Sequence, residues 1–215
     1  MIELHTQIAG EPFTLHAERA LWWPRLRSLL VADVHFGKGS VLRRAGVAVP
    51  TGQTFADLAR LDGLIAHYQP AQLIVLGDLV HGSAPPDAAW IAQVSHWRQR
   101  HADVEMRLIA GNHDRHFDAR KLGFAVIIDA LRIDDIVLRH EPAVITGGYV
   151  LAGHVHPGIR LQDGWRRHRL PVFRFGRHGG LLPAFGTLTG LYETPQSPGE
   201  RLFAVTPAGL IPIEG

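Results

Sequence analysis

Cysteine is absent from all 215 residues of the chain. Its absence excludes disulfide bonds and metal sites built on thiolates, although it does not identify the compartment. The sequence also lacks any uninterrupted apolar run of about 18 residues or more, so we predict no membrane-spanning helix. Residues 1–5 carry no basic flank followed by an apolar stretch. We therefore expect no signal peptide and, by default, a cytoplasmic protein.

The chain has little excess charge of either sign. Its net charge of +2 is too small to indicate nucleic acid binding by itself. Basic side chains are nevertheless concentrated between residues 160 and 178, where Asp163 is the one acidic residue. They are Arg160, Arg166, Arg167, His168, Arg169, Arg174, Arg177 and His178, and a second group is Lys38, Arg43 and Arg44.

Such basic clusters have two interpretations, and the sequence leaves both open. They can follow a phosphate backbone by releasing its counterions, or they can be solvated surface loops. We name Arg166, Arg167 and Arg169 as the candidate contacts to a substrate of this kind.

Apolar periodicity divides the chain into two halves. Buried strands are predicted at residues 29–32, 73–76 and 106–110, and amphipathic helices at 53–68 and 88–100. From residue 124 onward the pattern changes to short strands, at 124–128, 135–139, 149–152, 158–162, 170–175 and 202–206. No internal repeat or low-complexity linker interrupts it. We predict one α/β domain over residues 1–215, with helices over one mixed sheet or over two packed sheets.

Side chains that can bind metal ions follow the predicted strands. Three groups stand at the ends of the first three strands: Asp33 with His35, then Asp78, then Asn112 with His113 and Asp114. Two more stand in the second half: His140, and His154 with His156. Because the carboxyl ends of strands meet at one edge of an α/β sheet, these loops should converge.

The spacing of these residues suggests how they act together. Asp33 and His35 are two residues apart, so in an extended chain both side chains would project the same way and could chelate one ion. We expect the same extended geometry of His154 and His156. Glycines 77, 111 and 153 directly precede ligand motifs, where a close backbone approach or an unusual dihedral angle is often needed.

Each motif is weak alone. An isolated Asp-x-His is more often a turn than a pair of ligands, Gly-Asp ordinarily caps a strand, and His140 could be a core histidine. Gly-His-Val-His at 153–156 is the strongest piece, since two histidines on one strand face are uncommon. All five motifs at strand ends indicate a metal centre. Its oxygen and imidazole donors suit Mn²⁺, Fe or Zn²⁺.

The order of these motifs resembles that of the calcineurin-like metallophosphoesterase superfamily. The resemblance extends to the flanking segments and is closest to the bacterial PdeM group, described as a ligase-associated DNA damage response endonuclease. The segments that carry it are Asp33 to Gly39, Leu76 to His81, His140 to Pro142, Gly153 to Pro157 and Leu182 to Gly190. It implies a four-layer sandwich of two packed β-sheets flanked by helices.

The resemblance also implies how the residues divide their roles. One divalent ion would be held by Asp33, His35, Asp78 and His156. The other would be held by Asp78, Asn112, His140 and His154. Asp78 would bridge the two ions, with Mn²⁺ preferred, and a hydroxide shared between them would attack phosphorus. His113 would be the catalytic residue that contacts phosphoryl oxygens and helps the leaving group depart. Asp114 is expected to anchor its loop.

One position distinguishes the chain from the related protein Ser/Thr phosphatases. Those enzymes carry an acidic residue three positions after the Gly-Asp motif, followed by an arginine, where this chain has His81 and Gly82. The difference argues against a phosphoprotein phosphatase. His81 could assist a leaving group, bind substrate or hold the loop, so it joins the candidate substrate contacts.

The resemblance favours a metal-dependent phosphodiesterase or nuclease linked to DNA repair, with a repair ligase or helicase as expected partners. Two alternatives stay open. One is a phosphohydrolase of nucleotides or another small phosphate ester. The other is a catalytically weak scaffold within a repair complex, which would be expected to lose metal ligands. The motifs do not determine the oligomeric state.

Overall fold

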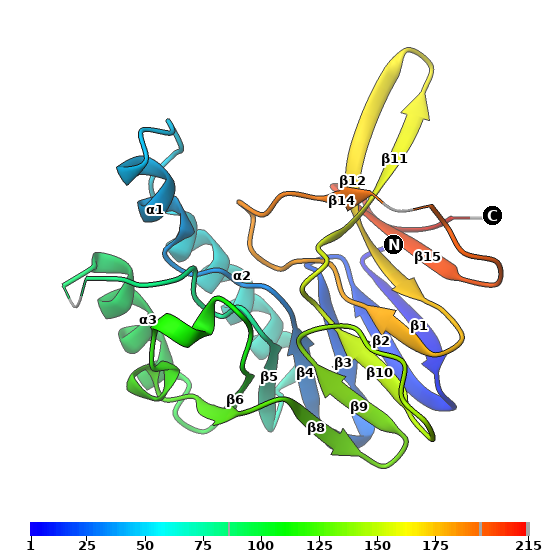
Figure 1. Ribbon diagram of the computed structural model, residues 1–215, viewed down its shortest axis with the longest axis horizontal. Coiled ribbons are helices and arrows are strands. Elements are labelled where there is room, and N and C mark those ends of the chain that lie inside the picture. Colours follow the sequence, from blue (N-terminus) through cyan, green and yellow to red (C-terminus); the bar gives the residue numbers. More distant parts are fainter. Residues whose placement is uncertain (86, 194, 214–215) are drawn as a thin grey trace.

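The computed structural model describes residues 1–85, 87–193 and 195–213, without the side chains of Asp163 and Arg166. Two mixed β-sheets form its framework (Figure 1). The first sheet has the strand order β1 to β7, antiparallel from β1 to β4 and parallel from β4 to β7. Its strands are β1 Glu3–Ile8, β2 Glu11–His16, β3 Ala20–Trp23, β4 Ser28–Val31, β5 Gln72–Leu76, β6 Glu105–Ile109 and β7 Ala125–Ile127.

The second sheet has the order β14-β11-β12-β13-β10-β9-β8, with β15 pairing to β12 and β16 to β15. Its strands are β8 Ala130–Ile133, β9 Ile136–Arg139, β10 Tyr149–Ala152, β11 Pro157–Asp163, β12 Arg166–Phe175, β13 Gly179–Leu181, β14 Tyr192–Glu193, β15 Arg201–Thr206 and β16 Gly209–Ile213. Only the second half of β12 lies within the main body of the sheet. Its first half pairs with β11 in a hairpin that projects away from the molecule (Figure 1).

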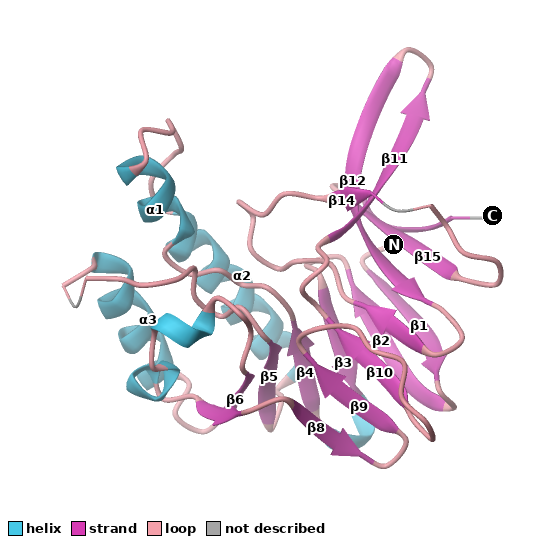
Figure 2. Ribbon diagram, in the orientation of Figure 1, coloured by secondary structure: helices cyan, strands magenta, loops and turns pink. Residues whose placement is uncertain are grey.

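The helices gather beside the parallel half of the first sheet (Figure 2). The α-helices of the described residues are α1 Lys38–Arg44, α2 Gln53–Tyr68 and α3 Ala89–Arg100, and the short 3-10 turns are η1 Pro24–Leu26, η2 Asp114–His116 and η3 Ala119–Leu122. Helix α2 begins after Gly52, which caps it in a left-handed conformation with φ +86°. The helix buries one apolar face that includes Leu58 and Leu61. None of the described helices is long and apolar enough to cross a membrane.

The central strands of the first sheet are buried on both faces. In β4, Leu29 and Val31 join the core beneath the helices, whereas Leu30 joins the core between the sheets. β5 alternates in the same way. Because successive side chains of a strand point to opposite faces, such strands read as continuous apolar runs rather than as alternating ones.

The predicted fold class is confirmed, and of the two arrangements left open the chain adopts the two packed sheets. Helix α2 has the predicted bounds, and the buried strands agree within one residue. The N-terminal strands β1 to β3, helix α1 and the short strands β8, β13, β14 and β16 were not predicted. The division into halves is also shifted, because β7 completes the first sheet beside β6.

Candidate metal centre

The predicted ligands converge where strands of both sheets end. Hydrogen bonds tie the loops together: the amide of Asp33 donates to the carbonyl of Gly77 over 3.1 Å, and the amide of His35 donates to the carbonyl of Asp78 over 2.8 Å. The amide of His154 donates to Asp33 Oδ2 over 2.9 Å, which joins the second sheet to the first. The centre therefore spans the edge between the two sheets.

One group consists of Asp33, His35 and His156. Each offers a ligand atom, and these atoms lie within 4.8 Å of one another. The Nε2 atoms of His35 and His156 are 3.2 Å apart, and His156 Nε2 is 3.5 Å from Asp33 Oδ1. Asp33 is completely buried. This arrangement can hold one metal ion.

A second group consists of Asp78, His140 and His154, with the same spacing of ligand atoms. His154 Nδ1 lies 3.0 Å from His140 Nε2, and Asn112 Oδ1 also lies 3.0 Å from that nitrogen. The amide oxygen of Asn112 therefore faces the same point as the two imidazoles. These residues can hold a second ion.

Asp78 lies between the two groups. Its Oδ2 is 3.8 Å from His35 Nε2 in the first group, and its Oδ1 is 3.5 Å from His140 Nε2 in the second. The carboxylate is only 2% exposed, and within the described part of the chain it makes no ion pair with lysine or arginine. Buried charges are normally paired or bound to a metal, so this donor set fits a pair of divalent cations.

The surroundings keep the imidazole of His35 neutral. Burial, followed by the nearby positive charge of Lys38, lowers its pKa to about 2. Burial also lowers the pKa of the Lys38 amine, whereas Asp78 and Asp33 act in the opposite direction. Because a histidine binds metal through its neutral ring, this histidine needs no proton removed before it can act as a ligand.

The backbone of the ligand motifs is left-handed rather than extended. φ is 53° at Asp33, 54° at His35, 67° at His154 and 50° at His156. The expected extended geometry is therefore wrong for both pairs. Each chain turns sharply as it leaves its strand. Asp33 and His35 still enter one group, whereas His154 and His156 enter different groups.

The three glycines that precede ligand motifs leave room for this packing, and a Cβ added at Gly111 would collide with the carboxylate of Asp78. Gly77 has φ +79°, and a Cβ added there would collide with the ring of His140. A Cβ at Gly153 would lie 2.6 Å from Asp33 Oδ2. Each glycine lets a ligand from a different loop approach the backbone closely.

His113 borders the centre from the η2 side. Its amide donates to Asp78 Oδ1 over 3.0 Å, and its Nε2 is 4.0 Å from Asp78 Oδ2. His81 stacks on His113 with ring centroids 4.6 Å apart, and its Nδ1 lies 3.3 Å from His35 Nδ1. Asp114 accepts from the amides of Gly111 and Val80, so it anchors this loop as expected.

The basic stretch does not form one free patch. Glu193 pairs with both Arg160 and Arg169, and Arg174 is buried against Glu200. Arg167 is exposed and makes no ion pair with a described side chain. Of Arg166 only the backbone lies within the described part of the molecule.

A hollow of about 480 Å³ adjoins the second group. It is lined by Asn112 and His140 and also by Arg115 and Arg139, which the sequence did not single out. The one signal available was proximity in the chain: Arg115 follows Asn112 by three residues, and Arg139 directly precedes His140.

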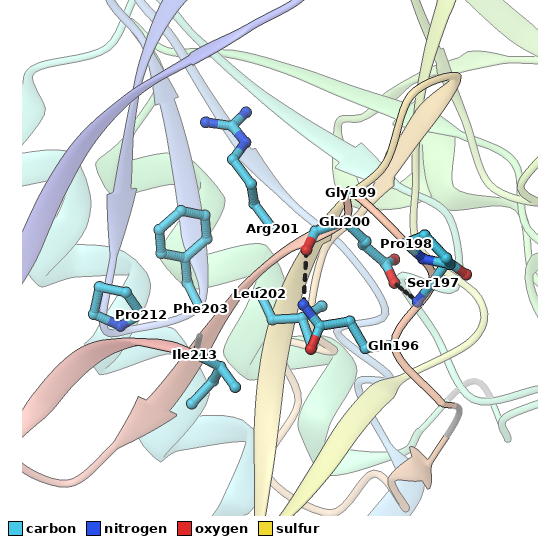
Figure 3. Close-up of a pocket in the computed structure, with 10 residues that line it drawn as sticks. All are labelled: Gln196, Ser197, Pro198, Gly199, Glu200, Arg201, Leu202, Phe203, Pro212 and Ile213. Atoms are coloured by element: carbon cyan, nitrogen blue, oxygen red, sulfur yellow. Dashed lines mark hydrogen bonds between the residues drawn. The ribbon is translucent and has the colours of Figure 1, made fainter. Parts of the chain in front are cut away.

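Another hollow lies between the 196–200 loop and strands β15 and β16 (Figure 3). There, Gln196 Nε2 donates to the carbonyl of Glu200, and the amide of Ser197 donates to its carboxylate. None of the predicted ligands lines this hollow, so the candidate chemistry lies at the metal centre.

The fold and the paired groups define a metal-dependent phosphoesterase. The model of the calcineurin-like phosphoesterase family matches residues 26–154. The chain belongs to this family.

Solved structures extend the comparison. A structure described as nuclease MPE from Pseudomonas putida is 38% identical, covers 98% of this chain and 100% of its own, and has a TM-score of 0.86. The phosphoesterase Yfce from E. coli is 16% identical over 84% of this chain and 88% of its own, with a TM-score of 0.43. No curated protein sequence matches the chain.

Proposed function

We propose that this protein is a two-metal phosphodiesterase that cleaves nucleic acid. The position of Asp78 carries the proposal, because its two carboxylate oxygens face histidines of different groups. The nuclease described from P. putida supports a nucleic acid substrate. His81 and Gly82, in place of the phosphatase residues, argue against a phosphoprotein substrate. Asp33, His35 and His156 hold one ion with Asp78, while Asn112, His140 and His154 hold the other.

The side chains around the ions have separate roles. Two bound divalent ions would neutralise phosphoryl charge and lower the pKa of bound water from 15.7 to about 7 in favourable cases. His113, partly exposed beside Asp78, contacts a phosphoryl oxygen. It donates a proton to the leaving oxygen or stabilises the negative charge that forms there. His81 stacks on His113 and fixes the plane of its ring.

The test is hydrolysis of bis(p-nitrophenyl) phosphate by protein loaded with Mn²⁺. His113→Ala should lower kcat by about a hundredfold or more, because one proton donor is lost, while metal content stays at two equivalents. Asp78→Asn should lose activity and also bind less metal, because both ions share that carboxylate.

The control is His116→Ala, which removes an exposed histidine three residues after His113. It should retain wild-type activity and metal content. Full activity in Asp78→Asn would contradict the mechanism, and loss of metal in His113→Ala would make that residue a ligand instead.

A second candidate function is hydrolysis of a nucleotide or another small phosphate ester. The hollow beside Asn112 and His140 favours it, because about 480 Å³ is within the usual range for small-ligand sites. Arg115 lines this hollow, and so does Arg139, which is paired with Asp129. A substrate panel of phosphomonoesters, nucleotides, and single- and double-stranded DNA separates the two candidates. Manganese as the physiological ion and a repair ligase or helicase as partner stay predictions from the resemblance. A cytoplasmic location stays the default expectation from the sequence.

A further inference from the structure

The hairpin of β11 and β12 projects from the second sheet without a layer against it (Figure 1). We call residues 157–170 the arm. It begins directly after His156 of the first metal group, and at its root the amide of Tyr192 in β14 donates to the carbonyl of His156 over 2.9 Å. A ligand bound along the arm would therefore lie next to the metal centre.

Aromatic rings are exposed at both ends of the arm. Trp165 at the tip is 102% exposed, and Tyr192 beside the root is 62% exposed. An indole is usually buried for most of its surface, so full exposure on a projecting hairpin marks a contact surface. Arg167 and His168 lie along β12 between the two rings; both are exposed, and as neighbours in a strand they face opposite sides of the hairpin.

The base of the arm is braced. Glu193 pairs with Arg160 over 3.1 Å and also with Arg169, whose Nη2 donates to the carbonyl of Leu191 over 2.6 Å. Arg160 and Arg169 are cross-strand partners, so this carboxylate holds both strands of the hairpin to β14. The tip is thus presented at a restricted position relative to the metal centre.

We propose that the arm binds the nucleic acid strand that leaves the metal centre and that Trp165 stacks on one of its bases. This inference rests on the proposed function. Aromatic side chains interleaved with basic ones are typical of surfaces that bind single strands, because every base has a face that can stack. Arg167, two residues after Trp165 and exposed, supplies charge toward the phosphates.

The length of the arm sets a minimum length for the strand. β11 spans seven residues, which at about 3.3 Å each extend roughly 20 Å from the metal centre. At a stacked rise of about 3.4 Å per nucleotide, that distance corresponds to about six nucleotides, or fewer in an extended strand. A dinucleotide at the metal centre does not reach Trp165.

The experiment measures equilibrium binding of fluorescent oligothymidylate of about twelve nucleotides, a length within the range that single-strand sites cover. All variants carry His113→Ala to prevent cleavage. Trp165→Ala should weaken binding about tenfold, while Trp165→Phe, which keeps a ring, should weaken it less. The dependence of affinity on salt should be unchanged in Trp165→Ala, whereas Arg167→Gln should reduce the slope of log K against log salt by about 0.7.

Val144→Ala is the matched control, since it also removes an exposed apolar side chain but lies outside the arm. It should bind as the parent does. Equal affinity of Trp165→Ala and the parent would overturn the proposal. The proposal would also be overturned if Trp165→Ala weakened dinucleotide binding as much as oligothymidylate binding. A change in self-association without a change in oligothymidylate binding would overturn it too. Failure of the wild-type protein to hydrolyse any diester would refute the proposed function alone, because the binding series still decides the role of Trp165.

Discussion

At the scale of residues, the metal centre is built on a left-handed backbone conformation that residues other than glycine rarely adopt. Asp33, His35, Asp78, His154 and His156 all have φ between 50° and 67°. Each such residue costs of order 1–3 kcal/mol unless its surroundings fix it. Here the hydrogen bonds between the loops and the packing against glycines hold the conformation. The same turns direct donors from separate strands toward shared points.

A substitution at Gly77 tests whether the geometry of the metal ligands depends on this packing or on the backbone conformation alone. Gly77→Ala should lower metal content and diester hydrolysis at least tenfold, because the new Cβ collides with the ring of His140. Gly82→Ala is matched to it, since φ is +76° there and a Cβ would meet nothing within 4 Å. Both changes should cost roughly 1 kcal/mol of stability for the left-handed backbone.

Elemental analysis, hydrolysis of bis(p-nitrophenyl) phosphate and urea unfolding read out the comparison. Gly82→Ala should keep wild-type metal content. If the two variants lose metal equally, backbone strain in the loop decides ligand geometry and the contact with His140 does not.

At the scale of elements, strong periodicity predicted structure well and weak patterns did not. Helix α2 was predictable because it carries apolar residues at helical spacing over 16 residues. β2 contains Pro12, and α1 has only seven residues including Gly39, so neither gives a clear local pattern. The convergence of ligand loops followed from strand ends. The left-handed turns and the hollow beside Arg115 depend on contacts between loops, which no local pattern encodes.

The bracing of the arm gives a prediction for this element. Glu193→Gln should release Arg160 and Arg169 from their shared carboxylate, so oligothymidylate should bind more tightly at low salt. The slope of log K against log salt should steepen by up to about 0.7 for each arginine that then contacts a phosphate. Fluorescence anisotropy at several salt concentrations measures both quantities.

Glu105→Gln provides the control, because it makes the same change in net charge. Glu105 is paired with Arg107 on β6, at the end of the strand opposite the metal centre. It should leave the slope unchanged. Equal effects of the two variants would mean that net charge, rather than the arginines of the arm, governs binding.

At the scale of the whole molecule, the first sheet links the two cores. Leu29 and Val31 pack under the helices, and Leu30 between them in sequence packs against the second sheet. Neither core can unfold without disturbing β4, because this strand contributes side chains to both. This sharing favours cooperative unfolding, although chains of this size often populate intermediates. The prediction of one domain over residues 1–215 can be tested on that basis.

The whole chain should unfold in a single transition. Far-ultraviolet circular dichroism, dominated by the helices on one side, should give the same midpoint as tryptophan fluorescence, to which both cores contribute through buried residues such as Trp23 and Trp97. Because ligands come from both sheets, Mn²⁺ should raise both midpoints together, with a gain in unfolding free energy of about 2.7 kcal/mol for each bound ion at a hundred times its Kd. Gly77→Ala should show little of this gain. Loss of the helical signal before the fluorescence change would instead divide the molecule into two units, with the metal centre stabilising the boundary between them.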